Sequence, residues 1–341
     1  MRHIQKYLRF FLKGCISGVI AIVILSLFSL VYFNRPVVTA QPDQYTNYNY
    51  LANGQWSDMT EGWGFGKTNS LGYIDADYSV PQSPDILVLG SSHTEALQIP
   101  STNNFVSLTE QLLATDADTQ NNYSCLNLGV SGHTFATQIS NLPYLMEHFD
   151  ETKYVVIETS NFNYSVAELE KMLAGGFSVE TKEKSTIYKL AQKIPYLRLL
   201  ANQYQGTQDN DNSATAAAPE YDSEAYRKAF SAVAGFVAET AQAEGFRVIF
   251  LYHTQNPIGN DSSETPAYIN EQLDIVQSIC DENGICLINT VPVFTEHFAK
   301  TYEHAYGFAN TQPDFGHLNG VGHKLAADAL YDAIITMEEA K

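Results

Sequence analysis

Basic residues are scarce in this chain of 341 residues, which has 19 Lys and Arg against 38 Asp and Glu and a formal net charge of −19. Proteins that bind nucleic acids gather Lys and Arg on one surface, where these displace the counterions of the phosphate backbone. The deficit of basic residues argues against such a surface. No nucleic acid is expected as a partner.

Cysteine is also rare, with four residues, and no two of them form a C-x-x-C pair. A zinc or redox site built from paired thiolates is therefore not expected. Cys15 falls in an apolar run, which leaves Cys125, Cys280 and Cys286 for the rest of the chain. Cys280 and Cys286 are close enough to bridge across a turn in an oxidising compartment, and two reduced thiols are the equal alternative.

Charge is absent from one long segment near the N-terminus. Residues 14–33, GCISGVIAIVILSLFSLVYF, are uncharged, whereas residues 1–13 hold four Lys or Arg and no acid. Twenty such residues in a helix span roughly the 30 Å of a bilayer core. We expect a transmembrane helix over residues 14–33, with residues 1–13 in the cytoplasm and the rest of the chain outside. A signal peptide cleaved near Ala40 is the alternative, although the apolar run is longer than a signal sequence needs.

The remainder of the chain divides into two parts that differ in their hydrophobic pattern. Residues 34–80 show little periodicity and are expected to form a stem, and residues 81–341 form the main domain. In that domain short apolar runs alternate with amphipathic stretches, as in a parallel sheet with crossover helices. The expected strands are 85–89, 124–130, 154–159, 247–252 and 285–289, and the expected helices are 104–115, 135–149, 222–244, 266–282 and 320–340.

Because these strands are apolar throughout, both faces of the sheet should be covered. The predicted fold class is α/β, a three-layer α/β/α sandwich with a central parallel sheet of five strands. Residues 165–224 form an insertion between the third and fourth strands. Within it, residues 205–224 have almost no large apolar side chain, which predicts a mobile loop and makes the insertion a candidate lid.

Reactive side chains follow the expected strands. Ligands of open parallel sheets bind beyond the carboxyl ends of the strands. Ser92 follows the first strand, Gly132 the second and Asn161 the third, and Asp314 and His317 precede the last helix. A serine nucleophile needs a base held by a carboxylate, and the oxyanion that forms on attack needs N–H donors. The set predicts acyl-transfer chemistry.

These residues resemble the four blocks of the SGNH, or GDSL-type, hydrolase superfamily. The blocks are Ser92 in LGSSHT, Gly132 in NLGVSGHT, Asn161 in IETSNFN, and Asp314 with His317 in DFGHLN, across residues 85–325. The resemblance implies a flavodoxin-like fold and a triad of Ser92, His317 and Asp314. It also implies an oxyanion hole of the Ser92 and Gly132 backbone N–H groups with the Asn161 side chain.

The resemblance to membrane-anchored members implies a serine esterase or O-acyltransferase that needs no cofactor. Its substrate would be an acyl ester, such as an acetyl ester, of a cell-envelope carbohydrate, and a membrane-bound acyltransferase would be its partner. Two blocks depart from the family pattern. Ser91 replaces the usual acid before the nucleophile, and Phe162 follows Asn161, which leaves Asn163 as a rival oxyanion donor. A catalytically inactive protein that binds carbohydrate or assists polysaccharide assembly is therefore the alternative.

Other polar residues near these blocks admit simpler readings. His93 and His133 lack the spacing of a metal site, so no metal is expected, and they are expected to line the acceptor pocket or bond nearby carbonyls. His253 is expected at the surface or at the end of a strand. Glu158, at the end of a buried strand, is either a structural hydrogen-bond partner or a residue that tunes the site.

Overall fold

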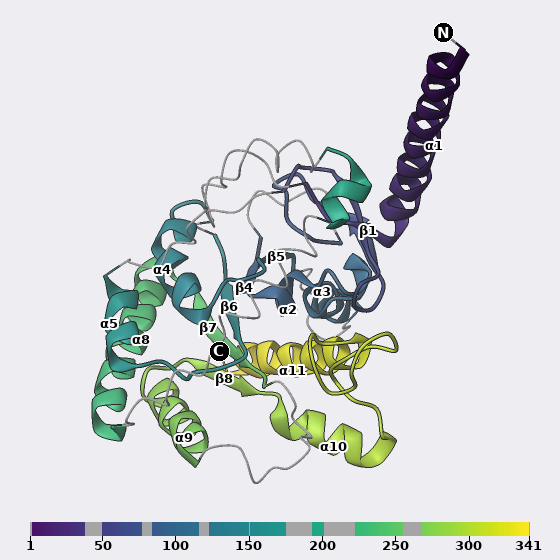
Figure 1. Cartoon of the computed structure of the whole chain (residues 1–341). Helices are drawn as coiled ribbons and strands as arrows, with labels where there is room; N and C mark the ends of the chain where they lie inside the picture. The colour runs from purple at the N-terminus through teal and green to yellow at the C-terminus, as the bar shows by residue number, and fades with distance from the viewer. Residues whose placement is uncertain are drawn as a thin grey trace.

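The computed structural model describes residues 2–37, 50–76, 84–115, 123–149, 151–174, 193–200, 222–254 and 267–340. At its centre lies a parallel sheet of five strands in the order β5-β4-β6-β7-β8 (Figure 1). These strands are β4 (Ile86–Gly90), β5 (Cys125–Gly129), β6 (Tyr154–Thr159), β7 (Arg247–Tyr252) and β8 (Cys286–Asn289). All five lie where the sequence predicted them, and the α/β fold class is confirmed.

Helices cover both faces of the sheet, which is why its strands are apolar throughout. Leu87 and Leu89 pack in one core cluster, whereas Ile86 and Val88, which alternate with them, pack in the other. The first face is covered by α4 (Phe135–Met146), α5 (Val166–Leu173), α8 (Ser223–Glu244) and α9 (Ala267–Glu282). The second face is covered by α3 (Phe105–Thr115) and α11 (Gly320–Glu339), so the domain has three layers (Figure 1).

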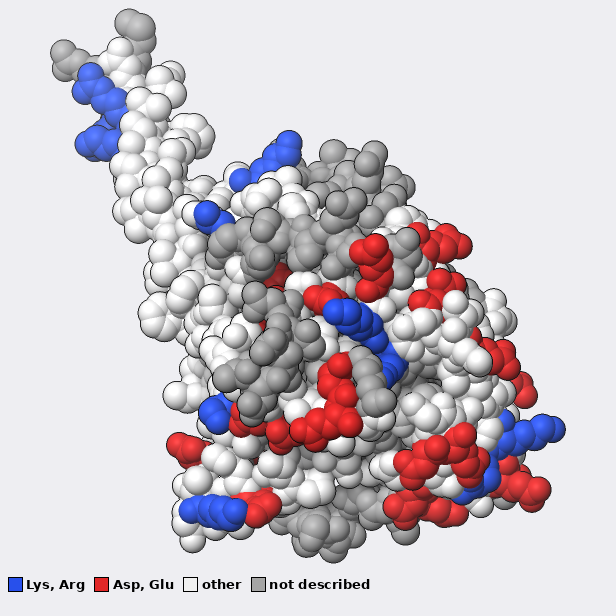
Figure 2. Space-filling view, turned by 180° about the vertical axis from the view of Figure 1, so that it is seen from behind, with Lys and Arg blue, Asp and Glu red and all other residues white. Residues whose placement is uncertain are grey.

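The N-terminal residues form a single long helix, α1 (Arg2–Tyr32), that projects from the domain (Figure 1). Its segment Ile4–Tyr32 is long and apolar enough to cross a membrane: a stretch of 18 residues within it has a mean hydropathy of 2.5 and is almost entirely unburied. In Figure 2 the outer end of this helix carries basic side chains, and the stretch next to the domain is white. The predicted span 14–33 lies within this helix, except for its last residue.

The predicted stem is part of the folded domain. A second sheet joins β1 (Phe33–Asn34) to β2 (Gln55–Asp58) and β3 (Gly64–Lys67) in antiparallel order. Trp56 packs in a small core with Tyr50, Ile74 and Leu97, which ties residues 50–76 to the main domain. Strands of two to four residues are too short to show a hydrophobic period, so the sequence did not reveal them.

The insertion between β6 and β7 is only partly described. It contains α5, and residues 195–200 are helical. Most of the predicted mobile loop 205–224, and with it the lid prediction, lies outside the described residues. The helix α10 (Val291–Thr301), between β8 and α11, was not predicted. Cys280 and Cys286 are free thiols, and burial raises the pKa of Cys280 to about 12.

Candidate active site

A tight turn presents Ser92 at the carboxyl edge of the sheet. β4 ends at Gly90, and the short helix α2 (Ser92–Glu95) begins two residues later. The Ser91 side chain caps that helix by accepting the His93 backbone N–H. A Cβ at position 90 would lie 1.8 Å from Thr94 Oγ1, so only glycine lets the strand pass this close to the helix. Ser92 is the first helical residue and is partly exposed.

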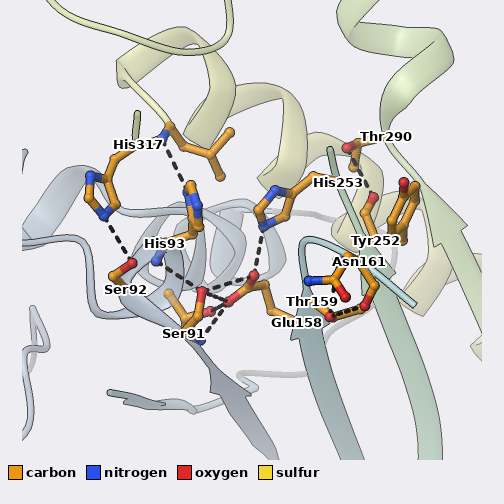
Figure 3. Close-up of polar contacts among 12 residues, drawn as sticks. Ser91, Ser92, His93, Glu158, Thr159, Asn161, Tyr252, His253, Thr290 and His317 are labelled. Carbon is orange, nitrogen blue, oxygen red and sulfur yellow. Dashed lines mark hydrogen bonds and ion pairs between the residues drawn. The ribbon is translucent and has the colours of Figure 1, made fainter. Parts of the chain in front are cut away.

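His317 reaches Ser92 from the other end of the domain. It lies in the turn before α11, and its Nε2 is 2.9 Å from Ser92 Oγ (Figure 3). Its Nδ1 is 2.6 Å from Oε2 of Glu61, and its backbone N–H donates to Glu61 Oε1 at 2.9 Å. Serine hydroxyl, imidazole and carboxylate therefore form one chain of hydrogen bonds. The sequence identified the first two members and missed the third.

The carboxylate beside His317 belongs to Glu61, which corrects the assignment of Asp314. Asp314 lies with its Oδ1 3.4 Å from Nδ1 of His304. The turn at Gly316, with φ of +90°, gives the physical reason: a Cβ there would lie 2.3 Å from Glu61 Oε1. The glycine thus lets Glu61 occupy the space beside the backbone of His317, and Asp314 faces a different histidine.

Glu61 is held in place by the loop that carries it. Asn310 accepts the Gly62 backbone N–H at 2.9 Å and donates to the Met59 carbonyl at 3.0 Å, so one side chain ties both sides of Glu61. Met59 also donates its backbone N–H to the carbonyl of Tyr32, the last residue of α1. The position of this carboxylate therefore depends on the segment that follows the apolar helix.

The electrostatics keep Glu61 ionised. Its partial burial acts to raise its pKa, but the hydrogen bonds and the charge of His317 outweigh burial, and the pKa of Glu61 is lowered. An ionised Glu61 accepts a hydrogen bond from Nδ1–H of His317, which leaves Nε2 of His317 free to accept the Ser92 proton. This is the tautomer that a general base needs. The geometry can therefore activate Ser92 as a nucleophile.

His93 packs as a neutral ring behind the site. Its ring centroid is 5.1 Å from that of His317, and its Nδ1 accepts the Leu318 backbone N–H at 3.3 Å. Burial, followed by the charge of His253, holds the pKa of His93 well below its usual range. His93 therefore supports the turn that carries His317 and does not compete for the Ser92 proton.

A buried carboxylate lies directly beneath the nucleophile turn. Glu158, in β6, is fully buried and accepts hydrogen bonds from the Ser91 backbone and hydroxyl at 2.7 and 2.9 Å and from the Thr94 hydroxyl at 2.8 Å. His253 Nε2 lies 2.7 Å from its other oxygen (Figure 3). Burial alone would raise the pKa of Glu158, but the bonds from His253 and Ser91 hold it at about 2.

This network bears on the predictions made for Glu158 and His253. Glu158 is a structural hydrogen-bond partner of the turn next to Ser92, since it accepts bonds from Ser91 and Thr94. His253 does lie just after a strand, but it is buried, and its Nδ1 lies 2.6 Å from the Tyr306 hydroxyl. The only sequence signal for such a pair was a charged residue and a histidine at the ends of neighbouring buried strands.

The residues assigned to the oxyanion hole lie at the same edge of the sheet. Gly132 has a φ of +86° in the turn after β5, and a Cβ there would meet no described atom within 4 Å. Asn161 follows β6, and its Oδ1 accepts the Asn163 backbone N–H at 3.2 Å, which leaves its NH₂ group as a donor. In Figure 3 Ser92 lies on one side of Glu158 and Asn161 on the other. Their role as oxyanion donors stays a prediction.

Among the described residues, no group of three or more His, Cys, Asp or Glu side chains is arranged to hold a metal ion. His133 lies in the turn that contains Gly132, and burial lowers its pKa to about 4. It is therefore a neutral ring at physiological pH.

Solved structures similar to this chain include two acetyl xylan esterases and a member of the lipolytic G-D-S-L family. An acetyl xylan esterase, AlAXEase, is 17% identical, with a TM-score of 0.41 over 73% of this chain and 99% of its own. An acetylxylan esterase from Geobacillus stearothermophilus is 14% identical, with a TM-score of 0.42 over 75% of this chain and 96% of its own. A member of the lipolytic G-D-S-L family from Veillonella parvula is 14% identical, with a TM-score of 0.39 over 73% and 97%.

No protein-family model matches the sequence, and no curated protein matches it. At these identities and TM-scores the activities of the similar solved structures do not transfer to this chain. The function is therefore argued from the side chains around Ser92.

Proposed function

We propose that this protein is a serine esterase or O-acyltransferase with Ser92 as its nucleophile. The observation that supports the proposal is the continuous chain from Ser92 Oγ through His317 to Glu61, with donor–acceptor distances of 2.9 and 2.6 Å. These distances lie within the range over which a base takes the proton of a nucleophile. The members of this chain come from three distant parts of the sequence, and together they form a complete acyl-transfer triad.

In the proposed mechanism Ser92 Oγ attacks the carbonyl carbon of an ester and passes its proton to Nε2 of His317. Glu61 stabilises the resulting imidazolium and keeps it oriented. The backbone N–H groups of Ser92 and Gly132, with the Asn161 amide, stabilise the oxyanion, and each donor lowers the barrier by about 3–4 kcal/mol. His317 then protonates the leaving alcohol, and an acyl-enzyme remains on Ser92.

The acyl-enzyme is resolved by a second nucleophile. His317, neutral again, takes a proton from water or from an alcohol, and that oxygen attacks the acyl carbon. The bond between the acyl carbon and Ser92 Oγ then breaks, and His317 returns the proton to Oγ. Water gives hydrolysis, and a sugar hydroxyl gives transfer of the acyl group. The same residues serve both outcomes, so the activity is proposed as esterase or O-acyltransferase.

The proposed location follows from α1. Lys6, Arg9 and Lys13 lie in its first half, and positive residues stay in the cytoplasm, so the helix would anchor the chain with its active site outside the cell membrane. The resemblance to anchored members extends the proposal to short acyl esters, such as acetyl esters, of cell-envelope carbohydrate. It also extends it to a membrane-bound acyltransferase as the acyl donor.

An esterase assay tests this proposal. The full chain, purified in detergent, should release p-nitrophenol from p-nitrophenyl acetate, and Ser92→Ala should lower that rate about 10³-fold or more, because no other hydroxyl contacts His317 Nε2 among the described residues. Ser278→Ala, on α9, where the hydroxyl donates to Glu282, is the matched control and should leave the rate unchanged. Equal rates for wild type and Ser92→Ala would refute the proposal and favour a binding protein without catalysis.

A further inference from the structure

A cavity of about 260 Å³ opens between the ends of β6 and β7 and the helix α9. Residues 160–163 line it from β6, Tyr252 and Thr254 from β7, and Gln272 and Leu273 from α9. Pockets that bind drug-sized ligands have volumes from about 300 Å³ upward, so this smaller cavity suits a single small ring. Nothing in the proposed triad uses it.

The lining of this cavity combines aromatic and neutral polar side chains. The rings of Phe162 and Tyr252 stack with centroids 5.5 Å apart and an interplanar angle of 25°. Amide and hydroxyl groups make up most of the rest, and none of the described lining residues is charged. Such a lining binds a neutral ligand with apolar faces and hydroxyl edges, and it discriminates against phosphate or carboxylate ligands.

One lining residue points to a hydrogen-bonding ligand. Gln272 is only 3% exposed, and no donor reaches its carboxamide oxygen among the residues that the structure describes. A buried acceptor without a partner lowers stability, and most buried polar atoms have one. An incoming O–H group in the cavity would provide it.

The cavity lies within reach of Ser92. Ser92 follows β4, and the cavity lies at the ends of β6 and β7, which are the next two strands of the sheet. Neighbouring strands are about 4.8 Å apart, so these chain ends lie about 5–10 Å from the turn that carries Ser92. In Figure 3 Tyr252 and Asn161 lie on one side of Glu158 and His253, and Ser92 lies on the other. Asn161 belongs both to the proposed oxyanion hole and to the cavity wall.

We propose that this cavity binds the neutral sugar ring of an acylated carbohydrate, with a ring hydroxyl donating to Gln272 and the ester group extending toward Ser92. The inference rests on the proposed function and assigns a binding site to the sugar part of its substrate. Selectivity for a sugar ester over a simple aryl ester would then arise at Gln272. The triad itself would treat both esters alike.

The test replaces Gln272 by methionine in the full chain in detergent. Methionine keeps the volume and removes the acceptor, so the variant should fold with a melting temperature no lower than that of the wild type. The probes are a methyl glucopyranoside with one O-acetyl group and p-nitrophenyl acetate. We expect KM for the sugar ester to rise about two- to tenfold, as for one lost hydrogen bond, with kcat and the rate on p-nitrophenyl acetate unchanged.

Gln277→Met is the matched control, since Gln277 lies on the same helix and bonds to Asp281 away from the cavity. It should leave both substrates unaffected. An unchanged KM for the sugar ester in Gln272→Met, or an equal loss on both esters, would overturn the inference.

A binding measurement separates this inference from the proposed function. Unesterified methyl glucopyranoside should give saturation-transfer NMR signals with the wild type and weaker signals with Gln272→Met. If the chain hydrolyses neither ester but shows this difference, the proposed activity fails and the sugar site stands. If p-nitrophenyl acetate is hydrolysed through Ser92 and the sugar neither binds nor reacts, the sugar site fails alone.

Discussion

Glu61→Gln should lower kcat for p-nitrophenyl acetate about 10³- to 10⁴-fold, while Asp314→Asn should leave kcat close to that of the wild type. The expectation follows from the contacts of His317, whose backbone N–H and Nδ1 both bond to Glu61. Asp314 lies against His304 and does not touch His317 among the described contacts. Both substitutions replace a carboxylate by a neutral amide. Only Glu61 contacts His317, so only its substitution should affect the base.

The size of the Glu61 effect depends on the tautomer of His317. In Glu61→Gln the amide oxygen would accept the backbone N–H, and the NH₂ group would face Nδ1. Nδ1 would then have to accept, the ring proton would move to Nε2, and Nε2 could no longer take the proton of Ser92. The variant would keep its fold and bind substrate, so KM should change little.

Asp314→Asn is a fair control because asparagine tolerates the left-handed backbone that Asp314 adopts, with φ of +60°. Melting temperatures of both variants should be compared with the wild type, to separate activity from folding. An Asp314→Asn variant as damaged as Glu61→Gln would mean that Asp314 orients His317 during the reaction, which the geometry contradicts.

Glu158→Gln should lower the free energy of unfolding by about 3–5 kcal/mol, because it breaks a buried ionic network and leaves groups unsatisfied. Glu158 accepts bonds from Ser91, Thr94 and His253, and a glutamine amide cannot accept all of them. Glu303→Gln is the matched control: Glu303 bonds to His297 at 3.2 Å on the surface, where such a pair contributes about 1 kcal/mol or less. Urea unfolding of the full chain in detergent measures both.

The pH dependence of this difference follows from the pKa of Glu158. Its value of about 2 in the folded protein is below the ordinary value of 4.5, so the unfolded chain binds the proton more tightly. The stability that the carboxylate contributes is therefore fully present above about pH 5 and is lost as the pH falls from 4.5 toward 2. The gap between wild type and Glu158→Gln should shrink as the pH falls below 4.5. A gap that widens on acidification, or a gap no larger than that of Glu303→Gln, would contradict the network.

The main sheet could be predicted from the sequence because a strand covered on both faces appears there as a continuous apolar run. β4, β6 and β7 were recognisable on this ground alone, and the reactive residues after them could then be assigned to one edge. Ser92 and His317 were found in this way, because their positions depend only on where a strand ends and where a helix begins.

Glu61 could not be found in the same way. It is 256 residues from His317 in the sequence and lies in a segment whose short strands show no periodicity. Asp314, three residues before His317, was the obvious local partner, and only the turn at Gly316 shows that it faces away. Glu158 shows the same limit: the sequence reveals an acid in a buried strand, but not the four donors that converge on it.

The central claim is that Ser92 is the hydroxyl activated by His317. It is tested most directly by treating the full chain in detergent with a fluorophosphonate and locating the adduct by peptide mass spectrometry. The account predicts a single adduct on Ser92, formed far more slowly in His317→Ala. An adduct on Ser91 or another residue, or labelling of Ser92 at the same rate without His317, would contradict it.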